Sequence, residues 1–222
     1  VGAICCAEHL VASMPTADHN RVSSALYGNA NMALISYSYI AMMGTEGLRA
    51  ATAAAILSAN YMAAKLRDAY GVVYVGTRGR VGHELILDCR QFHAIGITES
   101  DIAKRLMDFG YHAPTLSFPV HGTLMIEPTE SESLQEIDRF IDALLTIREE
   151  IREIERGEAE PKDNVLINAP HPEYEVVADE WKHSYSRRKA AYPTDWVAEN
   201  KFWIPVSRVD NGFGDRNLVA KY

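Results

Sequence analysis

A long amphipathic helix is the strongest pattern in the chain, and it follows Pro128. Its large apolar side chains recur at spacings of three and four residues: Leu134, Ile137, Phe140, Ile141, Leu144, Ile147, Ile151 and Ile154. This spacing places them on one helix face. Thr129 and Glu132 fit a capping box, which predicts that the helix begins there. The two β-prone runs just before it, 116–120 and 123–126, are the expected partners of the apolar face.

The segment from 72 to 156 predicts the order strand, strand, helix, strand, strand, helix. Residues 72–75 form a short β-prone run, and 83–89 alternate apolar and polar side chains. Residues 98–101 read as a helix start, and Gly110 ends that helix. This order is typical of an α+β fold, with a small open sheet and helices packed on one side.

Two helix patterns precede this segment and meet at Gly44, over 32–43 and about 45–68. Residues 21–26 predict a strand, which leads into a loop before the first helix. That loop contains Tyr27, Gly28, Asn29 and Asn31. A glycine-containing loop at a helix N-terminus suits an anion, although a plain loop with an asparagine cap explains the same residues.

The segment after Gly157 is interrupted by prolines and predicts an extended tail that wraps the rest of the protein, with one helix near 176–181. Its three tryptophans are expected to be buried: Trp181, Trp196 and Trp203.

Charge is unevenly distributed along the 222 residues, which carry a net charge of −8. The segment 127–160 holds 12 acidic residues and 4 arginines, which is already −8, so the remainder balances. Because phosphate contacts need clustered Lys and Arg, we expect no nucleic-acid partner. No apolar run approaches the ~18 residues of a membrane span. The three cysteines lack metal-type spacing, which favours reduced thiols in a cytoplasmic protein and no metal.

No nucleophile elbow, phosphate-binding loop or dinucleotide fingerprint occurs in the chain. The notable polar residues are single side chains beside predicted strands: Arg80 and His83 before one strand, and His112 and His121 on either side of another. A single histidine in such a place serves as a hydrogen-bonded structural residue or as a functional one.

Several motifs together resemble a known family. The stretch 122–132, Gly-Thr-Leu-Met-Ile-Glu-Pro-Thr-Glu-Ser-Glu, is similar to the C-terminal part of glycine decarboxylases, the P-proteins of the glycine cleavage system. Segments 42–48, 112–115, 168–171 and 214–218 resemble the same family, so the similarity covers nearly the whole chain.

The resemblance implies the C-terminal part of a fold-type-I, pyridoxal-phosphate (PLP) dependent transferase. It implies that 1–70 ends the large PLP domain with a connecting helix, 71–157 form a small α+β domain, and 158–222 form the tail. The implied reaction decarboxylates glycine and passes the aminomethyl group to the lipoyl arm of the H-protein.

Site residues follow from the same resemblance. The cofactor phosphate side is expected at Tyr27, Gly28, Asn29 and Asn31, and the substrate side at Arg80, His83, His112, Thr115 and His121. The family's His-Lys-Thr motif is absent, so no catalytic Schiff-base lysine is expected within this chain.

A missing N-terminal half or subunit is therefore an expected partner, in a homodimer or higher assembly, and the chain alone is expected to be inactive. The abrupt start at Val1 fits a fragment. The alternative is a non-catalytic structural or regulatory subunit, a degenerate paralogue, because the loop at 28–31 departs from the family's Gly-Ser-Ala-Ser pattern.

Overall fold

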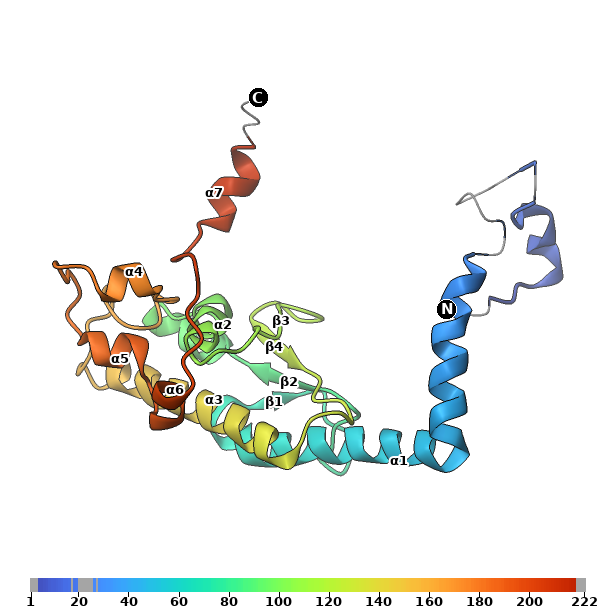
Figure 1. Cartoon of the computed structure of the whole chain (residues 1–222), viewed down its shortest axis with the longest axis horizontal. Coiled ribbons are helices and arrows are strands. Elements are labelled where there is room, and N and C mark those ends of the chain that lie inside the picture. Colours follow the sequence, from blue (N-terminus) through green and yellow to red (C-terminus); the bar gives the residue numbers. More distant parts are fainter. Residues whose placement is uncertain (1–3, 17, 20–25, 27, 219–222) are drawn as a thin grey trace. The chain divides into compact units, whose positions relative to one another are not determined.

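The computed structural model describes residues 4–16, 18–19, 26 and 28–218, which divide into two compact units at Thr52/Ala53. The strand expected at 21–26 lies outside the described residues, apart from Leu26. The elements in chain order (Figure 1) are η1 (Glu8–Ser13), α1 (Ala30–Tyr70), β1 (Val72–Val73), β2 (Leu85–Asp88), η2 (Arg90–Ile95), α2 (Glu99–Asp108), β3 (Thr115–Leu116), β4 (Thr123–Ile126), α3 (Leu134–Glu155), α4 (Glu173–Val176), α5 (Arg187–Ala191), α6 (Asp195–Glu199) and α7 (Asn211–Arg216).

Helix α1 contains the break expected at Gly44, whose φ of 60° and ψ of −177° are not helical. Glycine adopts this conformation without the steric cost that a Cβ would add. The two helical segments predicted around Gly44 are thus confirmed, and the second continues to Tyr70.

The sheet of the second unit is antiparallel, with the strand order β1-β2-β4-β3. Leu85, Leu87 and Cys89 are buried, as the alternation predicted, but Ile86 on the other face is buried as well. Two strands are shorter than predicted because non-glycine residues with positive φ end them: Tyr74 (56°) after β1 and Ser117 (51°) after β3. A left-handed residue cannot continue the extended ladder.

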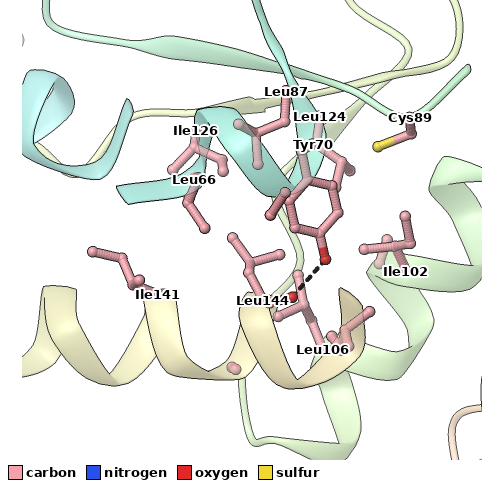
Figure 2. Close-up of a cluster of buried hydrophobic side chains, with 14 of the residues drawn as sticks. Leu66, Tyr70, Leu87, Cys89, Ile102, Leu106, Leu124, Ile126, Ile141 and Leu144 are labelled. Carbon is pink, nitrogen blue, oxygen red and sulfur yellow. Dashed lines mark hydrogen bonds between the residues drawn. The ribbon is translucent and has the colours of Figure 1, made fainter. Parts of the chain in front are cut away.

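Helices α1, α2 and α3 pack against one face of this sheet, and the predicted small open sheet with helices on one side is confirmed. Figure 2 shows the shared core, in which the sheet contributes Leu87, Leu124 and Ile126. The Tyr70 hydroxyl at the end of α1 donates to the Leu144 carbonyl of α3 over 2.6 Å. Because both groups are buried, this hydrogen bond fixes α1 against α3.

The start of α3 differs from the prediction. Thr129 has a φ of 56° and precedes the helix, whereas Ser133 is the N-cap and accepts from the Glu136 N–H over 3.2 Å. Leu134 is consequently 61% exposed at the first helical position. The remaining predicted positions, from Ile137 to Ile154, lie toward the core.

The start of α2 is as predicted. The Thr98 hydroxyl accepts from the Asp101 backbone N–H, and the Asp101 carboxylate accepts from the Thr98 backbone N–H over 2.8 Å. These reciprocal bonds satisfy N–H groups that a helix start leaves unpaired.

Within its described residues, 158–218, the tail contains only short helices, and the single turn of α4 stands in place of the helix expected near 176–181. The three tryptophans, which were expected to be buried, are only partly buried. Each lies beneath a cation: Trp181 under Arg187, Trp196 under Arg139 and Trp203 under Lys201. An indole ring in such a contact can remain partly hydrated. Across the part of the chain that the structure describes, no helix has the length and apolar character needed to cross a bilayer.

Candidate functional site

An open cleft of about 430 Å³ lies at one end of the sheet, between β3, β4 and the first turns of α3. Its floor is apolar, formed by Met62 of α1 with Ile137 and Phe140 of α3. The wall is the segment 111–115, which connects α2 to β3 and includes the first residue of β3. Apolar clefts with a few polar groups are typical of small-molecule sites.

The rim of the cleft is acidic, with Glu127, Glu132 and Glu136 along the path from β4 into α3. Glu127 lies 3.9 Å from the His83 imidazole, and both side chains are more than half exposed. Glu136 forms an ion pair with Arg139 over 2.5 Å. The exposed carboxylates favour a ligand with a positively charged group at the rim, while water screens much of the attraction.

The structure brings some of the expected substrate-side residues together. His112 and Thr115 are exposed and line the cleft, and His83 approaches the rim through Glu127. Arg80 is exposed in the loop that joins β1 to β2, the loop that also holds His83. His121 lies in the turn of the β3–β4 hairpin, whereas the cleft lies at the open end of that hairpin.

The expected phosphate-side residues belong to the other unit. Gly28 has a φ of 82°, and the Asn29 side chain accepts from the Asn31 backbone N–H over 3.0 Å, which caps α1. Tyr27 lies outside the described residues. This loop therefore has the glycine turn and the asparagine cap that its sequence indicates.

A buried polar cluster joins α2, α3 and the tail, and it was not anticipated from the sequence. The Arg105 guanidinium is fully buried and donates five hydrogen bonds at 2.7–3.0 Å. It is bidentate to Glu150, and its other acceptors are the Asp108 carboxylate and the carbonyls of Lys189 and Ala190. Such a cluster is tolerated in a core only because every charge has a partner.

The cluster continues into the tail through His171, which is fully buried. Asp108 accepts from the His171 backbone N–H over 2.7 Å and lies 2.8 Å from its Nδ1, while Nε2 lies 2.8 Å from the Tyr185 hydroxyl. Burial opposes the charge of Asp108, but the hydrogen bonds from His171 and the charge of Arg105 outweigh it and lower the pKa of Asp108. Lys201 donates to the Asp108 carbonyl over 2.7 Å, and burial lowers its pKa to about 8.

The contacts from Asp108 through His171 to Tyr185 do not activate the tyrosine hydroxyl. Burial raises the pKa of Tyr185 well above the usual tyrosine range, so its hydroxyl remains protonated near neutral pH. Within the described residues, no group of His, Cys, Asp and Glu is arranged to hold a metal ion. The cluster is thus a structural connection, and the cleft is the better candidate site.

Comparison with known proteins gives the family. The model described as "Glycine dehydrogenase, C-terminal domain" matches residues 51–171, more than half of the chain. The chain belongs to this glycine dehydrogenase family.

Relatives of this glycine dehydrogenase domain carry the name glycine dehydrogenase (decarboxylating). The relative from Bacteroides thetaiotaomicron is 63% identical over 225 residues, covering 99% of this chain and 24% of the relative. The relative from Bordetella avium is 58% identical over 200 residues, covering 90% and 21%. The relative from Flavobacterium johnsoniae is 56% identical over 229 residues, covering 99% and 24%. The chain therefore spans about a quarter of the length of these relatives.

The cleft of this glycine dehydrogenase domain does not by itself fit the PLP that the family implies. PLP is held by a lysine, and no lysine lines the cleft. Lys104 and Lys201 donate to backbone carbonyls elsewhere, and Lys189 pairs with Glu153. The residues that line the cleft lack the reactive amine.

Sequence reasoning on this glycine dehydrogenase domain missed most of the cleft. Met62, Tyr111 and Phe140 reach it from three separate segments, and only their fold brings them together. The clustering of Glu127, Glu132 and Glu136 around Pro128 was the available signal, because three carboxylates there flank a strand end.

Proposed function

We propose that this chain is the C-terminal portion of a PLP-dependent glycine dehydrogenase (decarboxylating), and that its cleft forms the substrate-side wall of the active site. The family match carries this proposal. The proposed organisation has residues 1–70 ending the large PLP domain, 71–157 forming the small domain and 158–222 forming the tail. The cofactor lysine comes from the rest of the full-length protein, so this chain alone is inactive.

The cleft residues bind and orient glycine in this proposal. His112 and Thr115 offer side-chain hydrogen bonds at the wall, and Arg80 and His83 offer positive or hydrogen-bonding groups near the rim. The carboxylates of Glu127 and Glu132 attract the glycine ammonium group, and the apolar floor excludes water. His121 lies at the turn of the hairpin and stays outside the cleft in this proposal.

The loop before α1 takes the cofactor's phosphate. Gly28 permits a close backbone approach, and the start of the helix capped by Asn29 offers N–H groups to an anion. PLP, when bound, supplies the electron sink for loss of CO₂. The proposal includes a lipoyl H-protein as partner, a homodimer or higher assembly, and a cytoplasmic location, without nucleic-acid or membrane contacts.

Spectroscopy and exchange assays on the full-length protein that contains this chain test the proposal. We expect the visible absorption of PLP bound to lysine, and glycine-dependent exchange of CO₂ in the presence of H-protein. The chain 1–222 alone should show neither. A full-length protein that lacks both properties refutes the proposal and favours the non-catalytic subunit.

Variants within the cleft test its role. Replacing His112 by Ala or Thr115 by Val should raise the KM for glycine by about three- to tenfold, since each removes a hydrogen bond to the substrate. Thr146→Val is the matched control, because Thr146 lies on α3 outside the cleft and should leave the KM unchanged. If all three variants had the same KM for glycine as the unsubstituted protein, the cleft would be excluded as the glycine site.

A further inference from the structure

A cluster of three side chains connects the tail to the wall of the cleft. The Arg139 guanidinium, on α3, lies 5.1 Å from the ring centroid of Tyr111 and 5.1 Å from that of Trp196. Tyr111 lines the cleft, and Trp196 belongs to α6 in the tail. The two rings also meet edge to face, with 6.3 Å between their centroids, so each of the three side chains contacts the other two.

The Trp196 ring is held in place from two sides. The Trp196 indole N–H donates to the Asp142 carboxylate of α3 over 2.8 Å. The Phe109 ring, which follows α2, packs on the same indole with 5.8 Å between centroids. Trp196 therefore has a defined orientation, although it is only partly buried.

The position of the Tyr111 ring depends on the side chains packed against it. The Tyr111 hydroxyl is buried and lies near Arg139 and Glu136. Its ring packs edge-on against Phe140 with 4.9 Å between centroids. Contacts with Arg139, Phe140 and Trp196 thus fix the position of this part of the wall.

We infer that Trp196 is a positioning residue for the cleft, which it shapes by packing against both Tyr111 and Arg139. This inference rests on the proposed function of the cleft and deepens it. The tail thereby acts on glycine binding without contacting glycine. Loss of the indole removes its own contact with Tyr111 and frees Arg139 to turn toward solvent with Glu136, so Tyr111 loses two neighbours on that side.

The test uses the full-length protein with Trp196→Ala and Trp196→Phe. Trp196→Ala should raise the KM for glycine by about three- to tenfold and leave kcat within about twofold, because the wall contacts bound substrate and not the reacting bonds. Trp196→Phe retains a ring over Arg139 and should restore most of the affinity. The glycine-induced rise in melting temperature should follow the same order as a second readout.

A double-mutant cycle tests the route. In a Tyr111→Leu background, Trp196→Ala should change the KM by less than about twofold, since the group through which it acts is gone. Additive effects, an unchanged KM for Trp196→Ala, or loss of folded protein with no change in KM each overturn the inference. If His112→Ala and Thr115→Val also leave the KM unchanged, the proposed function fails instead, and the two failures are distinguishable.

Discussion

Arg105 offers the sharpest test of how the tail is attached, because it is the fully buried cation of the cluster between α2, α3 and the tail. Replacing it by Met removes all five of its hydrogen bonds at nearly constant volume. The carboxylates of Asp108 and Glu150 then remain buried without the cation. Removing one partner of a buried ion pair costs about 3–5 kcal/mol. The carbonyls of Lys189 and Ala190 lose a donor as well.

Hydrogen exchange of the full-length protein measures this effect where it occurs. Amides of segment 164–191 should exchange faster by about two to three and a half powers of ten, which corresponds to that loss in opening free energy. Arg152→Met is the matched control, because Arg152 is on α3 and its ion pair with Glu149 is about half exposed. Its loss should cost less than about 1 kcal/mol.

Charge removal separates electrostatics from packing in the same experiment. Adding Glu150→Gln to Arg105→Met should recover part of the loss, because one of the two uncompensated charges is then gone. Equal exchange in the Arg105 and Arg152 variants, or no recovery with Glu150→Gln, would refute this account of the cluster.

Three further predictions concern the second unit. Burial holds the pKa of Lys201 near 8 in the folded protein, below the unfolded value of about 10.4, so the melting temperature should rise between pH 8 and pH 10 as the buried amine loses its charge. In Lys201→Met, melting temperatures measured at the two pH values should no longer show this rise. Gly122→Ala places a Cβ 2.6 Å from Cγ of Arg90 at a φ of 80° and should cost about 2–3 kcal/mol in thermal unfolding, against about 1 kcal/mol for Gly157→Ala, which meets open space at a φ of 71°. Tyr70→Phe deletes the buried hydroxyl that joins α1 to α3 and should cost about 1–1.5 kcal/mol in the same assay, whereas an unchanged melting temperature would contradict that role.

Local rules accounted for the elements whose signals lie within a few residues. The helix start at 98–101 and the apolar face from Ile137 to Ile154 follow from local sequence alone, and the structure has both. The start of α3 was misplaced because two capping patterns follow one another in the sequence, at 129–132 and at 133–136, and the positive φ of Thr129 leaves no mark in residue identity.

Long-range partners explain most of what the sequence did not predict. Arg105 and Asp108 are three residues apart on a helix and read as an ordinary exposed ion pair. They are buried because distant parts of the chain cover them: Ala190 lies 85 positions after Arg105, and His171 lies 63 positions after Asp108. The cleft has the same limitation, since Met62, Tyr111 and Phe140 meet only after the sheet and helices have packed.

The position of the tail in the chain has a consequence for biosynthesis. Arg105 leaves the ribosome 84 and 85 residues ahead of the two carbonyls that complete its shell, so α2 and α3 must pack while this guanidinium is still hydrated. Once residues 189 and 190 have been synthesised and have packed, their carbonyls complete the hydrogen bonds of Arg105 and water is excluded from the cluster. A chain truncated by a nonsense codon before residue 189 would leave the charged cluster around Arg105 exposed to water, and quality-control proteases would degrade it as an incompletely folded protein.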